Sequence, residues 1–349
     1  MNATTSYQRP SGNPLLQPND RGLYCAAGDF YVDPWAPVER AVITHAHSDH
    51  ARGGSVRYLV AAPGLAIAQR RLGSEAEIVP VDYGQKTTRH GVTISFHPAG
   101  HILGSAQIRI EYRGEVWVVS GDYKIDDDPT CAAFEPVKCH TFITEATFGL
   151  PIYRWPPARQ VFGEINEWWR GNQAAGKASV LFAYALGKAQ RLIAGVDAWN
   201  GPIYAHGALQ AINDLYRASN VALPPTGYVG EATRETDWSQ ALIIAPTSAR
   251  DTPWLRRFGR MSDGFASGWM RVRGQRRRRS IDRGFIISDH VDWPGLLLAV
   301  RETGAERVFV THGYISVVAR WLSEQGLEAY PLETRFAGDE EEVEGGDAM

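Results

Sequence analysis

The segment His45-Ala46-His47-Ser48-Asp49-His50 places four side chains that can bind a metal within six residues. It follows Arg40-Ala-Val-Ile-Thr44, an apolar run that predicts a buried strand. Side chains two residues apart in an extended chain point the same way, so His45 and His47 can bind one ion together. If the chain turns after the strand, Asp49 and His50 face a neighbouring position and can bind a second ion. Imidazole and carboxylate ligands suit zinc or manganese, whereas a structural zinc site normally includes thiolates. A histidine-rich loop that arose by chance is the alternative interpretation.

The length and composition of the chain are typical of a globular protein. Its 349 residues suffice for one large or two moderate domains, and 44% of them are hydrophobic. The sequence has no apolar run long enough to cross a bilayer and no secretion signal in its polar N-terminal segment, so we expect no membrane association. Three cysteines without a CxxC pair are typical of a reducing compartment, which predicts a cytoplasmic protein.

The charge of the chain is unevenly distributed. Residues 338–349 carry six acids and no bases, so we expect a disordered acidic tail there. Without these six acids, the net charge of −3 becomes about +3. Seven arginines lie between Arg271 and Arg283. Such a block can attract a polyanion, or it can be a solvated loop, and the charge pattern does not separate these interpretations.

Strand-like and helix-like segments alternate along the chain. This alternation predicts an α/β protein with a parallel sheet and helices on its faces. Strands are expected at 116–120, 141–144, 179–185 and 203–205, and helices at 159–170, 188–199 and 209–216. A further strand, helix and strand are expected at 284–288, 294–303 and 307–311. The two prolines within 153–157 predict one hinge, and the arginine block predicts a second.

Three more candidate ligands lie further along the chain, one in a glycine-rich loop and two directly after predicted strands. His101 lies in the glycine-rich loop 98–106, Asp122 follows the strand at 116–120, and His312 follows the strand at 307–311. In sheets of this kind, ligands bind at the carboxyl ends of the strands. Packing alone does not account for ligand-type residues at the ends of successive strands.

Three motifs in this order resemble those of the metallo-β-lactamase superfamily. They are the HxHxDH segment 45–50, the Gly-His-x-x-Gly-Ser loop 100–105 and Ser120-Gly-Asp122. Further motifs resemble the β-CASP nuclease branch of that superfamily. They are Thr144-Glu-Ala-Thr-Phe-Gly149, Ala185-Leu-Gly-Lys-Ala-Gln-Arg191, Phe265-Ala-Ser-Gly-Trp-Met270, Ser288-Asp-His290 and Val310-Thr-His-Gly313. The resemblance covers residues 22–332, nearly the whole chain, and the motifs are specific as a set.

Within the branch, Gly28-Asp-Phe-Tyr-Val-Asp-Pro34 and Ser288-Asp-His-Val-Asp-Trp293 most resemble bacterial ligase-associated DNA exonucleases. The resemblance implies a metallo-β-lactamase αββα sandwich with an inserted, shortened β-CASP-type α/β domain. The sandwich would comprise residues 1–150 and 281–337, the insert 151–280 and the tail 338–349. Two departures argue against RNA processing: the insert is shorter than in RNA 3′-end processing relatives, and Asp289 stands where those relatives usually have alanine.

The resemblance further implies a site with two divalent ions, zinc or manganese. The ligands would be His45, His47 and His101 for the first ion, Asp49, His50 and His312 for the second, and Asp122 as the bridge between them. Two such ions activate a water and stabilise the charge of an in-line phosphoryl displacement. Asp49 and Asp122 would therefore act in catalysis as well as in metal binding.

Other residues receive roles from the same motifs. His290 would be the general acid, and Glu145 would orient it by a hydrogen bond and raise its pKa. Asp33 would support a metal ligand, with a simple turn before Pro34 as the alternative. Ser105, Gly187 and Lys188 are candidates for contacts with substrate phosphates. Purely structural roles for His290 and Glu145 are the alternatives.

The expected function is that of a metal-dependent DNA exonuclease in DNA repair. Its substrate would be single-stranded or end-containing DNA, and the resemblance implies functional association with a DNA ligase and a helicase. An RNase of the RNA-processing β-CASP type is the alternative, because the phosphodiester chemistry is the same. A small-ester hydrolase, such as a lactonase or thioesterase, would leave His290, Glu145 and the arginine block without a role. The complete ligand set disfavours an inactive binding module.

Overall fold

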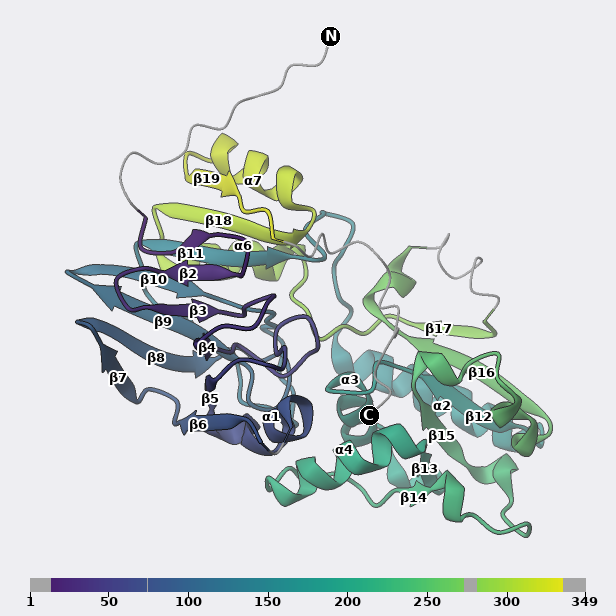
Figure 1. The fold of residues 1–349 in the computed structure, drawn as a ribbon. Helices are drawn as coiled ribbons and strands as arrows, with labels where there is room; N and C mark the ends of the chain where they lie inside the picture. Colours follow the sequence, from purple (N-terminus) through teal and green to yellow (C-terminus); the bar gives the residue numbers. More distant parts are fainter. Residues whose placement is uncertain (1–13, 74, 273–280, 335–349) are drawn as a thin grey trace.

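The fold is described by a computed structural model for residues 14–73, 75–272 and 281–334. The predicted acidic tail at 338–349 and the central part of the arginine block, 273–280, lie outside the described residues. Within the described ranges, no helix combines the length and apolar character that crossing a bilayer requires. Figure 1 shows two sheets stacked on one side of the molecule and a third sheet with its own helices beside them.

The first sheet is formed by the N-terminal part of the chain, in the order β1-β2-β3-β4-β5-β6. Its strands are β1 (Gln17–Pro18), β2 (Leu23–Cys25), β3 (Phe30–Val32), β4 (Arg40–Val42), β5 (Arg57–Ala61) and β6 (Glu77–Val81). The first three strands pair antiparallel, and β3 to β6 pair in parallel. The strand predicted at 40–44 is therefore confirmed, although it ends at Val42.

The second sheet joins the next strands of the chain to two strands from its C-terminal part, in the order β19-β18-β11-β10-β9-β8-β7. They are β7 (Lys86–Arg89), β8 (Val92–Pro98), β9 (Ala106–Tyr112), β10 (Glu115–Val119), β11 (Thr141–Ala146), β18 (Arg307–Gly313) and β19 (Glu328–Pro331). Strands β7 to β10 form an antiparallel meander, whereas β10, β11, β18 and β19 are parallel. Of the site side chains described below, Asp122 follows β10, Glu145 lies in β11 and His312 lies near the end of β18.

The first and second sheets pack face to face around a shared core. Buried residues from both sheets, including Val32 and Val42 of the first and Ile108 and Ile143 of the second, form one hydrophobic cluster. Helix α1 (Leu65–Leu72) packs on β5 and β6 of the first sheet. Helices α6 (Trp293–Thr303) and α7 (Ile315–Glu324) pack on β11 and β18 of the second. The layers are therefore helix, sheet, sheet, helix.

The third sheet is formed by residues that fall, along the chain, between β11 and β18 of the second sheet. All its strands are parallel, in the order β14-β13-β15-β12-β16-β17. They are β12 (Ala178–Phe182), β13 (Ile203–Ala205), β14 (Gly227–Tyr228), β15 (Leu242–Ala245), β16 (Met261–Ala266) and β17 (Arg283–Phe285). Its helices are α2 (Ala158–Ala174), α3 (Lys188–Gly195) and α4 (Gly207–Ala218). The prediction of an α/β protein is confirmed. The strands predicted at 179–185, 203–205 and 284–288 lie in this parallel sheet. Those predicted at 116–120, 141–144 and 307–311 lie in the second sheet, which is mixed.

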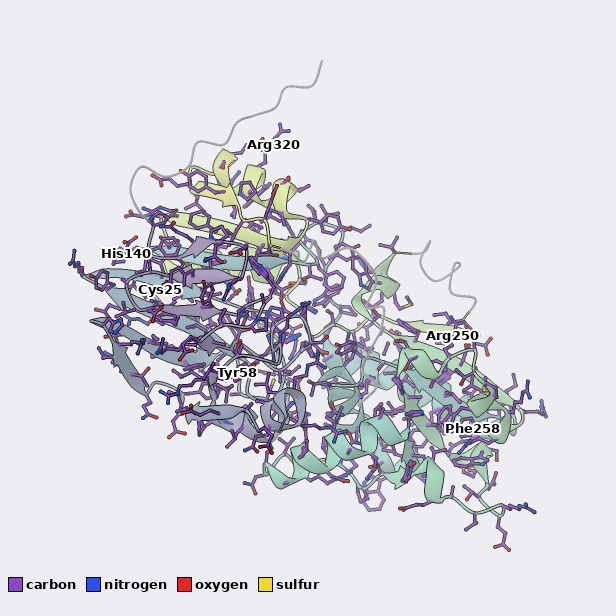
Figure 2. The ribbon with its side chains drawn as sticks, in the orientation of Figure 1. Cys25, Tyr58, His140, Arg250, Phe258 and Arg320 are labelled. Atoms are coloured by element: carbon purple, nitrogen blue, oxygen red, sulfur yellow. The ribbon has the colours of Figure 1, made fainter. Side chains whose placement is uncertain are left out.

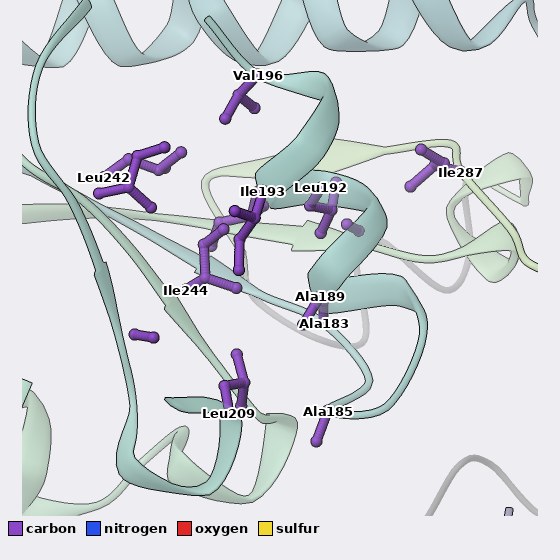
Figure 3. Close-up of a cluster of buried hydrophobic side chains, with 14 of the residues drawn as sticks. Ala183, Ala185, Ala189, Leu192, Ile193, Val196, Leu209, Leu242, Ile244 and Ile287 are labelled. Carbon is purple, nitrogen blue, oxygen red and sulfur yellow. The ribbon is translucent and has the colours of Figure 1, made fainter. Parts of the chain in front are cut away.

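The third sheet and the two-sheet unit share one hydrophobic cluster. Figure 3 shows its centre, where Leu192 and Ile193 of α3 pack near Ile244 of β15. Ala46 and Leu103, from the loops that carry the candidate metal ligands, belong to the same cluster. Packing of the third sheet's helices therefore helps to fix the position of those loops.

The helix predicted at 188–199 is shorter in the structure. Helix α3 ends at Gly195, because Val196 takes an extended conformation with φ −79° and ψ 156°. Asp197 then accepts a hydrogen bond from the Trp199 backbone N–H and caps a separate 3₁₀ turn at 198–200. The sequence pattern merged two helical segments that the Asp197 cap separates.

Candidate metal centre

The loop after β4 begins with a firm attachment to the end of the neighbouring strand β3. The Thr44 backbone N–H donates to Asp33 Oδ1 over 2.8 Å, and the Thr44 hydroxyl donates to Asp33 Oδ2 over 2.6 Å. Strands β3 and β4 are parallel, so their carboxyl ends lie side by side. Asp33 thus fixes the start of the loop that carries His45, His47 and His50.

Four buried side chains form a first compact group: His45, His47, His101 and Asp122, with one ligand atom from each within 4.8 Å of the others. His47 Nδ1 lies 3.1 Å from both His45 Nε2 and His101 Nε2. Asp122 Oδ2 is 3.4 Å from His45 Nε2. His101 comes from the loop between β8 and β9, and Asp122 follows β10.

The opposite ring nitrogens of these histidines are held by acceptors. His45 Nδ1 lies 3.0 Å from the Thr44 hydroxyl oxygen. His47 Nε2 lies 3.1 Å from the Leu186 carbonyl, and His101 Nδ1 lies 2.8 Å from the Asp289 carbonyl. A carbonyl can only accept, so these two nitrogens carry the ring proton and leave the other nitrogen free to bind a cation. Both carbonyls lie far along the chain from the histidines that they orient.

A second group contains His50, Asp122 and His312. Asp122 Oδ2 is 3.5 Å from His50 Nε2, and its other oxygen is 3.9 Å from His312 Nδ1. His50 is oriented by Asp33, whose Oδ2 lies 2.7 Å from His50 Nδ1. His312 lies near the end of β18 with φ 55°, a left-handed conformation that turns its side chain away from the regular strand.

These groups fit bound cations. Among the described residues, His50 Nε2 is buried and forms no hydrogen bond. Leaving such a nitrogen unpaired is costly, and a metal ion satisfies it. The Asp122 carboxylate belongs to both groups. Its Oδ2 lies 3.4 Å from His45 Nε2 of the first group and 3.5 Å from His50 Nε2 of the second, the position expected of a ligand between two ions.

The ionisation of the cluster also suits metal binding. Burial and the neighbouring His45 lower the pKa of His47 to about 3, so its imidazole is neutral at pH 7, the form that binds a metal. Burial would raise the pKa of Asp122, but His50 and His290 outweigh it and hold the pKa well below the usual value. Burial likewise opposes charge on His50, yet Asp49 and Asp122 raise its pKa well above normal. The negative charge of Asp49 and Asp122 favours a proton on His50, and a bound cation would take the place of that proton.

Asp49 lies at the edge of the second group. Its Oδ2 is 3.6 Å from His50 Nε2, and its side chain is 45% exposed. The compact groups defined by distance do not include it. Its role as a ligand of the second ion therefore stays a prediction.

A third group joins Glu145 and His290 to Asp122. Glu145 is completely buried in β11, and its Oε1 accepts a hydrogen bond of 3.0 Å from the Tyr123 backbone N–H. His290 Nδ1 lies 2.9 Å from Glu145 Oε2. Burial would lower the pKa of His290, but Glu145 and Asp122 outweigh it and raise that pKa to about 9. The structure thus gives Glu145 the position expected of a residue that orients His290.

The residues predicted to contact phosphates are buried and have partners inside the protein. The Ser105 hydroxyl accepts hydrogen bonds from the backbone N–H groups of His101 and Ile102. Gly187 begins α3 with φ 92°, and a Cβ there would lie 2.2 Å from Ile102 Cγ2. Lys188 is 2% exposed, with its Nζ 4.0 Å from Asp289 Oδ2. Their phosphate contacts stay predictions, and in the structure these residues contact residues 101, 102 and 289.

Sequence reasoning did not find two sets of residues around the centre. Thr44 and the Leu186 carbonyl orient histidines; Leu186 lies within the motif 185–191, but the motif gave it no such role. Arg191 and Asp289 face each other beside the site, with Arg191 Nη1 3.6 Å from Asp289 Oδ1. Both lie in motifs that the sequence displays, and the unusual Asp289 was the signal for this pair.

Comparison with known proteins gives partial matches. No protein-family model matches the chain. A protein named probable DNA ligase from Opitutus terrae is 31% identical over 319 residues, which are 89% of this chain and 30% of that protein. Endoribonuclease ysh-1 of Neurospora crassa is 30% identical over 154 residues, 42% of this chain and 17% of the relative. Endoribonuclease YSH1 of Saccharomyces cerevisiae is 27% identical over 162 residues, 46% of this chain and 20% of the relative.

The chain spans less than a third of the length of each of these relatives. The matches fit the resemblance to the β-CASP nuclease branch. A crystal structure of a protein of unknown function from Enterococcus faecalis V583 matches with a TM-score of 0.54 and 11% identity. It covers 86% of this chain and 80% of that protein, and at this identity it supports the α/β fold alone.

Proposed function

We propose that this protein is a metal-dependent nuclease that hydrolyses DNA phosphodiesters from a chain end. The single observation that carries the proposal is the Asp122 carboxylate shared by two groups of histidines, beside the His290–Glu145 pair. The proposed architecture is a metallo-β-lactamase sandwich with a β-CASP-type insert, predicted at 1–150 with 281–337 and at 151–280. The second boundary is shifted, because β17 (Arg283–Phe285) pairs with β16 in the third sheet and so belongs to the insert. The four layers, the parallel third sheet and the endoribonuclease relatives support this assignment.

Two divalent ions, zinc or manganese, would be held by His45, His47, His101, Asp122, Asp49, His50 and His312. When bound, such ions supply an acidified water as nucleophile and stabilise negative charge on the phosphate oxygens. The protein's part is to fix the imidazoles in their ligand tautomers. It does so through Thr44, the Leu186 carbonyl, the Asp289 carbonyl and Asp33.

His290 would protonate the leaving oxygen. Its Nδ1 is bound to Glu145, which leaves Nε2, on the other side of the ring, to donate a proton. With a pKa of about 9 the ring is protonated at neutral pH, and it regains from water the proton that it gives to the leaving oxygen. Glu145 is itself fixed by the Tyr123 backbone N–H, so the ring orientation is set before substrate binds.

DNA is the proposed substrate because the relative that matches 89% of this chain is named a probable DNA ligase. Involvement in DNA repair, functional association with a ligase and a helicase, and a cytoplasmic location are proposals from the sequence. An endoribonuclease activity is the second candidate, because two of the partial relatives carry that name.

The test uses DNA and RNA strands of one sequence, each labelled separately at its two ends. The purified protein, stripped of metal and resupplied with Mn²⁺, Zn²⁺ or Mg²⁺, is expected to release mononucleotides from one end of the DNA. Internal cleavage of RNA with intact DNA would instead support the endoribonuclease. Hydrolysis of a lactone or thioester with both strands intact would overturn the nuclease proposal. His206→Ala is the matched control for histidine variants, because His206 caps α4 outside the three groups.

A further inference from the structure

Five charged side chains are buried together beside the metal centre. They are Lys124, Asp128, Lys188, Arg191 and Asp289, and none is more than 8% exposed. Burying a charge is costly unless it is paired, and replacing buried ion pairs by apolar residues is often neutral or stabilising. Stability alone is therefore a weak reason for this network, and its contacts lead to the loops that carry His101 and His290.

Arg191 is the centre of the network. It lies on α3, and its Nη1 donates a hydrogen bond of 2.6 Å to the Ser288 carbonyl. The same nitrogen is 3.6 Å from Asp289 Oδ1, and Arg191 Nε is 3.4 Å from Asp128 Oδ2. A planar guanidinium can serve several acceptors in a fixed geometry, which a lysine ammonium does less well.

Asp128 joins Arg191 to the loop that precedes His101. Its Oδ2 lies 3.0 Å from Lys124 Nζ, which donates over 2.7 Å to the Gly100 carbonyl. Its Oδ1 accepts from the backbone N–H and hydroxyl of Thr130. Burial would raise the pKa of Asp128, but Lys124 and Arg191 outweigh it and lower that pKa, so the carboxylate stays charged. Every polar atom of this carboxylate is engaged.

His101 is held from both sides by this network. The preceding carbonyl, that of Gly100, is held by Lys124. His101 Nδ1 donates to the Asp289 carbonyl. The carbonyl of the preceding residue, Ser288, accepts from Arg191. The backbone at Gly100 allows no substitute, because its φ is 74° and a Cβ would lie 2.2 Å from the Lys124 carbonyl oxygen.

The loop 288–290 is bound at three successive carbonyls. The Ser288 carbonyl accepts from Arg191, the Asp289 carbonyl from His101, and the His290 carbonyl from Trp155 Nε1 over 2.9 Å. The loop has no helix or strand assignment, so these side-chain donors supply hydrogen bonds that regular structure would otherwise provide. Arg191 is the one charged donor of the three.

We propose that Arg191 is a positioning residue, which sets the orientation of His101 through the Ser288–Asp289 backbone and thereby the affinity of the first metal ion. The inference rests on the proposed metal centre and assigns Arg191 no contact with substrate or metal. Asp289 contributes to the same positioning, because its carboxylate faces the Arg191 guanidinium beside the loop.

The test measures metal binding rather than catalysis. Zinc is titrated into the metal-stripped full-length protein by calorimetry, and the wild type is expected to bind two ions. Loss of a group that orients a metal-binding histidine typically lowers metal affinity about 10–100-fold. Arg191→Met is expected to show a loss of that size at one of the two sites and little change at the other.

Two further variants make the result interpretable. Arg191→Met removes the positive charge that faces the buried carboxylates of Asp128 and Asp289, which lowers folding stability. Arg191→Lys, which keeps the charge, is therefore measured beside it. The lysine variant is expected to fold and to show a smaller loss at the same site. Arg250→Met is the matched control, since Arg250 pairs over 3.7 Å with Asp263 of β16 and lies on the side of the molecule that carries the third sheet (Figure 2).

Wild-type affinity at both sites in both Arg191→Met and Arg191→Lys would overturn the positioning role. So would an equal loss at both sites, or the same loss in Arg250→Met. If Arg191→Met does not fold, Arg191→Lys alone decides, and full affinity in that variant rejects the proposal. Failure of the wild type to bind two ions would instead reject the proposed metal centre.

Discussion

His290 Nδ1 lies 2.9 Å from Oε2 of Glu145, a carboxylate completely buried in β11. The two residues are 145 positions apart in the chain and meet beside Asp122. A buried carboxylate against an imidazole favours the protonated ring. The protonation of His290 in this pair therefore predicts how the rate of the reaction depends on pH.

The pH dependence of the reaction is predicted from the His290 pKa. The carboxylates Glu145 and Asp122 outweigh burial and raise this pKa to about 9, so the acid is protonated below that pH. The rate should therefore fall as the pH rises through about 9. Glu145→Gln keeps the side-chain shape but removes the charge, so the fall should begin at a lower pH. Rate measurements at fixed metal concentration from pH 6 to 10 would check this, and an unchanged alkaline limb in Glu145→Gln would contradict it.

His290→Ala should lower the rate roughly 10²–10⁴-fold while both ions still bind, because general acid catalysis contributes about that much. Metal content is measured by atomic emission on the same sample used for the rates. Loss of metal in this variant would show that His290 acts as a ligand, contrary to the assignment. His206→Ala provides the background effect of removing a histidine outside the site.

Asp122→Asn should release the second ion and abolish nearly all activity. The amide has one acceptor oxygen in place of two, so it cannot serve both groups of histidines. The bound metal should fall toward one ion per chain, again measured by atomic emission. Asp214→Asn, an exposed residue on α4, is the control. An active Asp122→Asn variant with both ions bound would remove the bridging role.

Asp33→Asn should weaken the second ion about 10–100-fold. In the native protein Asp33 Oδ2 accepts from both the Thr44 hydroxyl and His50 Nδ1. An amide nitrogen at that place favours the other tautomer of His50, with the proton on the nitrogen that faces the ion. Calorimetric zinc titration measures the effect, and Asp237→Asn, at an exposed cap, is the control. Wild-type zinc affinity at both sites in Asp33→Asn would show that Asp33 stabilises the turn and does not affect metal binding.

Two cysteines are predicted to resist alkylation at pH 8. Burial raises the pKa of Cys131 and of Cys139 to about 12, so very little of either thiol is ionised at that pH. Iodoacetamide should label both slowly in the folded protein and rapidly in guanidinium chloride. Mass spectrometry after timed quenching gives both rates. Fast labelling of Cys131 in the folded protein would show that its surroundings open on the timescale of the experiment.

The sequence predicted some elements well and others poorly. The strands at 116–120 and 141–144 are close to β10 and β11, because apolar runs between turn residues are local signals. The antiparallel meander β7 to β10 was not predicted, since strand pairing depends on partners that a run of apolar residues does not specify. The end of α3 was missed because Asp197, a cap for a separate turn, lies inside the apolar pattern.

The α/β class and the residue types of the site can be read from the chain alone, because strand-forming runs and ligand side chains such as His45 and His101 are local features. The way in which those ligands are held depends on the folded arrangement. The Leu186 carbonyl that orients His47 is 139 residues away, and the Asp289 carbonyl that orients His101 is 188 residues away. Such contacts exist only when the loop before α3 and the loop after β17 pack against the metal-binding loops. Hydrogen-bond geometry between them depends on that packing and on no spacing within the chain.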